Sequence, residues 1–295
     1  MSETCKLSIV AYTMGYGDSA ACLEKNGIIY GPIEEERFTR KRYESGLPIN
    51  SINYLLKAIN TKSSQIKSVL FHLKPNEKLR DRILFLGFNL FNAIKDSAYP
   101  KAFLNLLLMK YKLKKKIGID APIKNLPHHI CHASYSYFSS GFKNSLVITF
   151  DGAGDGLTGN VCSFQSDKIK EYANFKYPNS IGIFYSSISD YIGFPLPSGP
   201  GKVMGLSAYG DPNKYYKLLK KLIKVKKGHP IIDVSFFEFH KNLVTPNSKT
   251  KKRWLSKKFE KEIGFKRRFK GEDLSQPYID LAGSLQKVTT EIGVE

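Results

Sequence analysis

One pattern occurs twice along this chain and restricts its fold more than any other feature. An apolar strand is followed by a turn that contains aspartate and glycine, and then by two more extended segments. The extended segments of the first copy are residues 7–12, 19–23 and 28–34. Those of the second copy are residues 146–150, 160–165 and 169–175. Asn26-Gly27 joins two extended runs and is a strong hairpin signal. Asp18 and Asp151 occupy equivalent places in the two copies.

A repeat of this kind is typical of α/β proteins with a duplicated actin-like or ribonuclease-H-like fold, the two-lobed type of Hsp70 and the sugar kinases. We expect residues 1–120 to form the first lobe, with a helical insertion at about 77–116. Residues 121–295 would form a second lobe that is incomplete at its C-terminal end. Further helices are expected at residues 50–59, 181–191, 213–224 and 280–292, and further strands at 68–73 and 231–239.

Two histidines near the middle of the chain have the spacing of a metal site. If a helix starts after Pro127, His128 and His132 lie one turn apart on the same face. Asp151 follows a strand and precedes a glycine turn, where α/β sheets place their ligands. Two imidazole nitrogens and a carboxylate oxygen would suit a divalent transition metal with open positions. Without a neighbouring glutamate the pair is not the metalloprotease motif, and such a pair can also arise by chance. His129, three residues before His132, is a competing ligand.

A second candidate is the lysine of Gly199-Pro200-Gly201-Lys202. The segment is not a P-loop, because Val203 stands where serine or threonine would hold magnesium. Two interpretations stay open: a lysine that a tight loop presents to phosphate, and an ordinary surface lysine.

The charge is strongly positive, +20 over 295 residues. Residues 251–270 hold ten Lys and Arg against two Glu, and residues 101–116 hold six with no acid. Most runs of this kind are solvated faces, so we expect no nucleic-acid partner. The four cysteines form no CxxC pair and no signal peptide or membrane span is evident, which favours reduced thiols and a cytoplasmic location.

Five motifs occur in the order found in the O-carbamoyltransferases of nodulation-factor and antibiotic biosynthesis, and the chain resembles that family from its first strand to Gln286. The motifs are Asp18-Ser19-Ala20-Ala21-Cys22-Leu23, Glu34-Glu35-Glu36-Arg37-Phe38-Thr39-Arg40, His128-His129-x-x-His132-Ala133, Asp151-Gly152-x-Gly154, and Lys202-Val203-Met204-Gly205-Leu206-x-x-Tyr209-Gly210.

The resemblance implies an actin-like domain related to the tRNA threonylcarbamoyl transferases. A second domain, expected beyond residue 295, would make carbamoyl-adenylate from carbamoyl phosphate and ATP. The implied reaction moves the carbamoyl group to a hydroxyl of a small sugar-like or natural-product acceptor. His128, His132 and Asp151 would bind a divalent metal of the Fe2+ type, with a further aspartate from beyond the chain's end.

The resemblance also implies a set of residues in or beside the adenylate pocket. These are Asp18, Arg42, Gly152, Gly154, Lys202 and Gly205. Two departures stand out. Gly17 occupies the position of the family's histidine, a candidate general base, and Arg42-Tyr43 replaces the family's Lys-His.

Two other functions remain open: a tRNA threonylcarbamoyl-type modification protein, and a non-catalytic scaffold of the same fold. For residues 1–295 alone we expect poor folding and no transfer. The expected helix at 280–292 carries Leu281, Leu285 and Val288, for which the sequence offers no certain partner.

Overall fold

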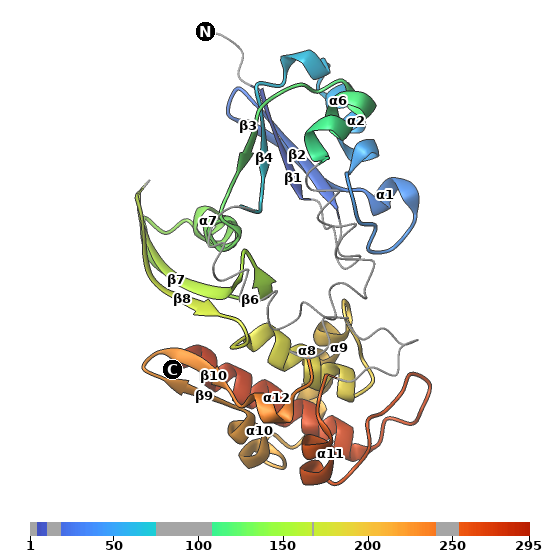
Figure 1. Ribbon diagram of the computed structural model, residues 1–295, viewed down its shortest axis with the longest axis vertical. Helices are drawn as coiled ribbons and strands as arrows, with labels where there is room; N and C mark the ends of the chain where they lie inside the picture. Colours follow the sequence, from blue (N-terminus) through green and yellow to red (C-terminus); the bar gives the residue numbers. More distant parts are fainter. Residues whose placement is uncertain (1–4, 11–18, 75–107, 167, 240–253) are drawn as a thin grey trace. The chain divides into compact units, whose positions relative to one another are not determined.

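The computed structural model describes residues 5–10, 19–74, 108–166, 168–239 and 254–295 (Figure 1). They divide into two compact units, one containing the described residues up to 131 and the other those from 132 onward. Each unit combines a sheet with helices, so the α/β class predicted from the sequence is confirmed. Of the predicted insertion at 77–116, residues 77–107 lie outside the described residues, and the rest is mainly helix α6.

The first unit is built on a five-stranded sheet with the strand order β3-β2-β1-β4-β5. Its strands are β1 (Cys5–Val10), β2 (Ala20–Lys25), β3 (Ile28–Glu34), β4 (Ser68–Phe71) and β5 (Ile123–Asn125). Its helices are α1 (Glu36–Thr39), α2 (Ile49–Ala58), the 3-10 turn η1 (Ser63–Gln65) and α6 (Met109–Ile117). Strand β1 runs antiparallel to β2 and parallel to β4, and β4 runs parallel to β5.

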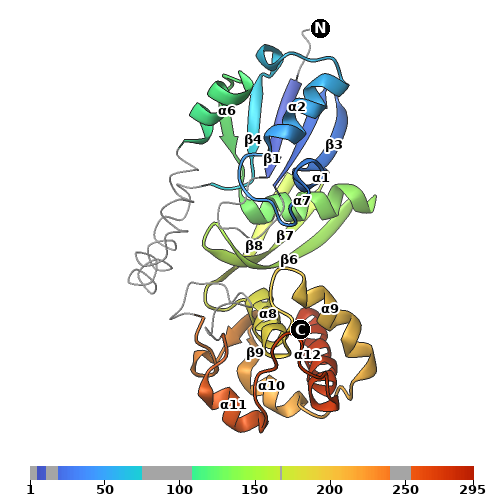
Figure 2. The ribbon, with the colours of Figure 1, turned by 90° about the vertical axis from the view of Figure 1, so that its right-hand side faces the viewer.

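Helices α2 and α6 cover the core of this sheet (Figures 1 and 2). In β1, Leu7 and Ile9 point to the buried face, and the residues between them are partly exposed, as expected when one face of a sheet is covered. Ile52 and Leu55 of α2 and Leu113 of α6 complete the cluster with at most 2% exposure. The spacing of Ile52 and Leu55 places both on one helical face.

Helix α7 (His128–Ser140) starts in the first unit and continues into the second, where it packs on a three-stranded sheet. The sheet has the order β6-β7-β8, with strands β6 (Asn144–Gly154), β7 (Leu157–Gln165) and β8 (Lys168–Lys176). Both neighbouring pairs are antiparallel, as in the β1-β2-β3 part of the first sheet. The repeated order of strand and hairpin predicted from the sequence is therefore present in both units.

The first strand of this sheet departs from its prediction in two respects. We expected a buried strand at 146–150, but only one face is covered: Val147 is 9% exposed, whereas Leu146 on the other face is 62% exposed. Helix α7 covers the Val147 side with Ala133 and Tyr137. The strand also continues through the predicted turn to Gly154, and a two-residue turn at 155–156 joins it to β7.

The rest of the second unit is a mainly helical layer. Its elements are α8 (Ile181–Tyr191), α9 (Gly199–Leu206), η2 (Ser207–Tyr209), α10 (Tyr216–Leu222), β9 (Ile223–Lys226), β10 (His229–Ile232), η3 (Val234–Phe236), α11 (Lys257–Ile263) and α12 (Gln276–Val294). Leu281, Leu285 and Val288 of α12 are fully buried in its core. The expectation that these side chains lack a partner in this chain is therefore wrong, because α8 and α10 pack on them.

Two further predictions are corrected here. The strand expected at 231–239 ends at Ile232, where Asp233 caps the turn η3 by accepting a hydrogen bond from the amide of Ser235. The helix expected at 213–224 ends at Leu222 and its last residues join β9, since β-branched Ile223 and Val225 pair with β10. Within the described residues, no helix combines the length and the hydropathy needed to cross a membrane.

Candidate metal and substrate site

The first turn of α7 carries the two histidines whose spacing predicted a metal site. Pro127 precedes the helix, and its carbonyl accepts a hydrogen bond from the amide of Cys131 at 3.0 Å. His128 is 4% exposed and begins the helix, and the side chain of His132, one turn later, is 51% exposed. One continuous helix therefore fixes the two imidazoles on the same face, one buried and one open to solvent.

Asp151 completes the group. Its Oδ2 lies 3.7 Å from Nε2 of His132, and one ligand atom each from His128, His132 and Asp151 lie within 4.8 Å of one another. His129, the competing ligand, is 2% exposed and does not belong to this group. Two nitrogens and one oxygen at this spacing fit a single divalent cation.

The strand places Asp151 at an irregularity rather than in a regular ladder. The pairing of β6 with β7 is regular up to Phe150 and resumes at Gly154 after a register shift. Bulges of this kind re-aim a side chain and are common beside functional sites. Two residues before the irregularity, the hydroxyl of Thr149 donates to Oδ1 of buried Asn160 at 2.8 Å, which fixes the strand where the bulge begins.

The start of α8 holds the backbone of Asp151. The hydroxyl of Ser180 donates to the carbonyl oxygen of Asp151 at 2.8 Å and accepts from the amide of Ile183 at 2.9 Å as the cap of α8. A Cβ on Gly182 would lie 2.7 Å from that carbonyl oxygen, so only glycine fits. The carboxylate itself accepts from the amide of Gly152 through Oδ1 at 2.6 Å. Oδ2 remains directed at His132.

Sequence reasoning missed His72. It directly follows strand β4, and its ring centroid lies 5.6 Å from that of His128, which in turn lies 5.3 Å from that of His129. The available signal was a histidine near the end of the strand predicted at 68–73, close to the edge where α/β sheets place their ligands. His72 belongs to the surroundings of the metal group rather than to the group itself.

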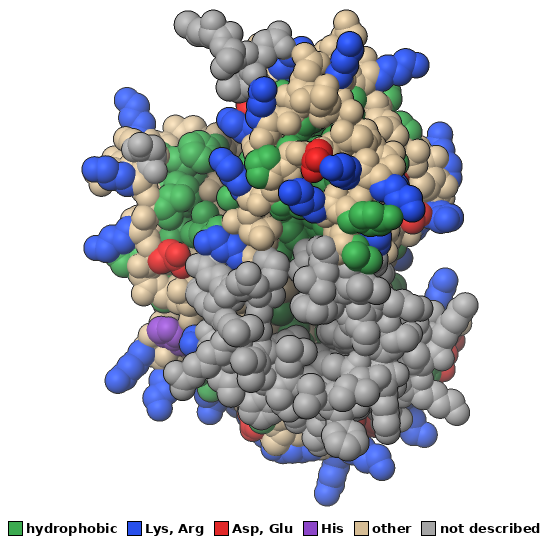
Figure 3. All heavy atoms as spheres, turned by 45° about the horizontal axis from the view of Figure 1, so that its top comes forward, with side chains coloured by type: hydrophobic (Ala, Val, Ile, Leu, Met, Phe, Trp, Pro, Cys, Tyr) green, Lys and Arg blue, Asp and Glu red, His purple; other side chains and the backbone are tan. Residues whose placement is uncertain are grey.

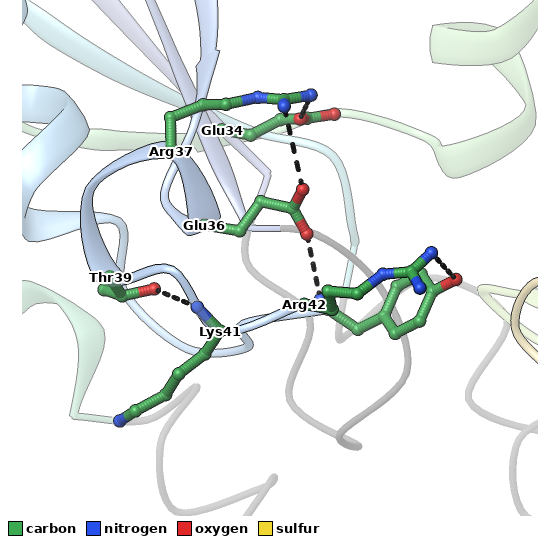
Figure 4. Close-up of polar contacts among 7 residues, drawn as sticks. Glu34, Glu36, Arg37, Thr39, Lys41 and Arg42 are labelled. Atoms are coloured by element: carbon green, nitrogen blue, oxygen red, sulfur yellow. Dashed lines mark hydrogen bonds and ion pairs between the residues drawn. The ribbon is translucent and has the colours of Figure 1, made fainter.

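The charged segment around α1 is ordered by its own polar contacts (Figure 4). The carboxylate of Glu36 accepts from the amide of Tyr43 at 3.0 Å, which closes the loop that follows the helix. The guanidinium of Arg42 stacks over the ring of Tyr43 at 5.3 Å and donates to its hydroxyl at 3.4 Å. Arg37 pairs with Glu34 at 2.8 Å. Tyr43 thus orients the guanidinium of Arg42, the residue of this segment that the resemblance places in or beside the adenylate pocket.

The other predicted residues are distributed over the chain. Gly152 and Gly154 belong to β6, beside Asp151. Lys202 and Gly205 are exposed residues of α9. Helix α9 begins at Gly199, so Lys202 lies in the first turns of a helix and not in a tight loop. Gly17 and Asp18 lie outside the described residues.

A comparison with known protein families shows to which family the chain belongs. The family model for the carbamoyltransferase N-terminus matches residues 8–295. The chain belongs to this family. The matched span contains His128, His132 and Asp151 as well as the charged segment around α1, so both lie within the part of the chain that this family model describes.

Two relatives show how much of a longer protein this chain matches. It is 32% identical to an uncharacterised protein of Synechocystis sp. over 97% of this chain and 46% of that protein. It is 26% identical to the nodulation protein NolNO of Sinorhizobium fredii over 93% of this chain and 37% of that protein. The chain therefore spans less than half the length of these relatives.

Similarity to solved structures is weak. YeaZ from Pseudomonas aeruginosa superposes with a TM-score of 0.33 and 9% identity over 59% of this chain and 69% of that chain. Similarity at this level does not distinguish one fold from another, and membership of the carbamoyltransferase family rests on the sequence match.

Proposed function

We propose that this chain is the transferring domain of an O-carbamoyltransferase. In the proposed reaction a hydroxyl oxygen of a small sugar-like or natural-product acceptor attacks the carbonyl carbon of carbamoyl-adenylate. The bond from that carbon to the phosphate oxygen breaks, AMP leaves, and the hydroxyl proton passes to a base. The observation that carries the proposal is the group of His128, His132 and Asp151, whose ligand atoms lie within 4.8 Å of one another in a chain of this family.

The donor set fits a divalent metal of the Fe2+ type, since two imidazoles and one carboxylate with open positions suit such ions. The side chains of His132 and Asp151 are 51% and 31% exposed, so a ligand can reach the group from solvent. When bound, the ion would polarise the carbamoyl carbonyl and stabilise the negative charge that develops on its oxygen. Ser180 and Gly182 support this role by holding the backbone that carries Asp151.

Two cations of the chain would balance the phosphate of the adenylate. We assign Arg42, whose guanidinium stacks on Tyr43, to an adenylate oxygen, because arginine presents a fixed fork of donors. By the resemblance, Lys202 of α9 is a second candidate cation, which would offer a point charge to phosphate. Gly152, Gly154 and Gly205 would let the nucleotide approach the backbone closely. Asp18 is the remaining proposed catalytic group, beside the position where Gly17 replaces the family's histidine.

The test uses the full-length protein, radiolabelled carbamoyl phosphate, ATP and a panel of hydroxyl acceptors. Pyrophosphate release reports adenylate formation, and label in the acceptor reports transfer. His132→Ala should keep pyrophosphate release and lower transfer by at least about a hundredfold. If the wild-type protein releases no pyrophosphate from ATP in the presence of carbamoyl phosphate, whichever acceptor is added, the assignment of carbamoyl-adenylate as the donor is wrong.

Experiments on the full-length protein also distinguish carbamoyl transfer from the two alternative functions, tRNA modification and a non-catalytic scaffold. A tRNA-modifying role predicts salt-sensitive tRNA binding. On the face that Figure 3 shows, the Lys and Arg side chains of the described residues are spread out instead of forming one patch. A scaffold predicts no turnover at all. If Gly17 removes only the base, Gly17→His should raise turnover by about a hundredfold or more.

A further inference from the structure

A cavity of about 550 Å³ lies in the second unit, away from the residues assigned above. The end of β8 forms one wall, and the hairpin of β9 and β10 forms the other (Figure 1). The lining residues that matter for the argument are Asn174, Phe175, Lys176, Lys226, Lys227 and His229. Its size falls within the range of about 300–1,000 Å³ that is usual for sites of small organic ligands.

The charge of the cavity is one-sided. Three lysines line it, Lys176, Lys226 and Lys227, and its lining includes no aspartate or glutamate. Ammonium groups gathered in a concave surface attract anions more strongly than the same groups spread over a convex one.

The position of Lys227 supports a functional role. Lys227 and Gly228 form the two-residue turn between β9 and β10, with φ angles of +52° and +71°. A turn with two positive φ angles favours Asn-Gly, the sequence that this chain uses at Asn26-Gly27. Lysine at the first position costs backbone energy that asparagine would avoid. The turn therefore places a lysine beside the cavity at a position where asparagine would make the turn more stable.

The rest of the lining combines the amides of Asn174 and Asn179 with aromatic and apolar groups. The ring of Phe175 meets the ring of His229 edge to face at 5.7 Å, and Nδ1 of His229 shares a hydrogen bond with the carbonyl of Lys227 at 2.9 Å. These two contacts hold the imidazole against the turn. Ile231 also lines the cavity and is 43% exposed, so an apolar group has a surface to rest on.

We infer that this cavity binds a small organic phosphate ester. Lys226, Lys227 and Lys176 hold the phosphate, and Phe175 and Ile231 receive the apolar or ring part. The site is separate from the residues proposed for carbamoyl transfer, and its existence does not depend on that proposal. The concave shape and the few ammonium groups favour a small molecule over a nucleic-acid chain, whose recognition uses extended basic surfaces.

Calorimetry on the full-length protein tests the inference with phenyl phosphate as the probe and with phenol and inorganic phosphate as its separate halves. Phenyl phosphate should bind more tightly than either half. Lys226→Gln/Lys227→Asn should weaken its binding about tenfold or more, because hydrogen bonds to charged groups are lost. Lys227→Asn alone should slightly raise the melting temperature, since asparagine suits the left-handed conformation, so weaker binding cannot be attributed to unfolding.

The control is Lys257→Gln/Lys261→Gln, which removes the same charge from exposed positions of α11. It should leave the affinity for phenyl phosphate unchanged, as should His132→Ala, which excludes binding at the metal group. Equal affinity in the cavity variant and the wild-type protein would overturn the inference. It would also be overturned if a short single-stranded RNA bound more tightly than phenyl phosphate and lost affinity in the same variant.

Discussion

The imidazole of His132 in α7 and the carboxylate of Asp151 in β6 face each other at 3.7 Å, with eighteen residues between them in the sequence. Neither side chain is buried, and the backbone of each is held independently. The helix fixes His132 relative to His128, and the start of α8 fixes Asp151. A preformed group of this kind loses little conformational freedom when it takes up a metal.

The first prediction concerns this group directly. His132→Ala should lower the affinity for a divalent transition metal by at least about tenfold, because one of three ligands is removed. The measurement is the metal content of purified protein after dialysis against a series of chelator concentrations. His229→Ala is the control, since it removes an exposed histidine that is not part of the group. Equal metal content in the His132→Ala variant and the control would refute the metal site.

The second prediction concerns the support of Asp151. Gly182→Ala should lower metal affinity although it touches no ligand atom, because the new Cβ would lie 2.7 Å from the carbonyl oxygen of Asp151 and displace it. Gly201→Ala is the matched control, as a Cβ there meets nothing within 4 Å. The same metal titration compares the two helical glycines. A Gly182→Ala protein that folds and keeps full metal affinity would show that the backbone of Asp151 is not held by α8.

The sequence was sufficient to predict the parts of the site that depend on local spacing. A proline followed by two histidines four residues apart predicts one helical face, and α7 has that face. The same holds for the strand that precedes Asp151 and for the order of strands and hairpins in both sheets. These features are short-range, and periodicity determines them.

The supports of the site arise from contacts between distant segments, which no local pattern encodes. Ser180 and Gly182 meet Asp151 across about thirty residues, and His72 meets His128 across more than fifty. The irregularity in β6 could not be predicted either, since it depends on the pairing with β7. The burial of Leu285 in α12 was missed for the same reason: its partners come from helices that precede it by sixty residues or more.

The third prediction concerns Glu35, which caps α2 from outside the helix. The residue is buried, with 4% of its surface exposed. Its carboxylate accepts hydrogen bonds from the amides of Asn50 and Ser51 at 3.0 and 2.9 Å and from the hydroxyl of Ser51 at 2.9 Å. Pro48 at the cap position offers no side-chain acceptor. Glu35→Gln replaces one acceptor oxygen by an NH2 group and should cost about 2 kcal/mol of stability.

Urea denaturation measures this cost, and Glu34→Gln is its neighbouring control. Glu34 pairs with Arg37 at the surface, with side-chain exposures of 38% and 68%, so its loss should cost less than about 1 kcal/mol. If both variants lose the same small amount of stability, Glu35 does not act as the cap of α2.

The last prediction uses the buried ion pair of Asp190 and Arg267, whose atoms Oδ1 and Nη2 lie 2.7 Å apart with side-chain exposures of 5% and 8%. Burial raises the pKa of Asp190 to about 6, although Arg267 opposes the shift. The folded protein therefore binds more protons than the unfolded chain between about pH 4 and pH 6, and the stability from this carboxyl falls as pH rises through that window. Above this pH window, the contribution of Asp190 to the free energy of unfolding no longer changes with pH as long as Arg267 is present.

Arg267→Met removes the opposing charge and should raise the pKa of Asp190 further. The folded variant then keeps its proton to a higher pH, so its stability continues to fall above pH 6, by up to about 1.4 kcal/mol per pH unit. The cost of Arg267→Met, measured as the difference in urea midpoint from the wild-type protein, should therefore be larger at pH 8 than at pH 6. Asp190→Asn/Arg267→Met should show no such increase, because the titrating group is gone. A cost of Arg267→Met that is equal at both pH values would mean that Asp190 does not titrate in this range.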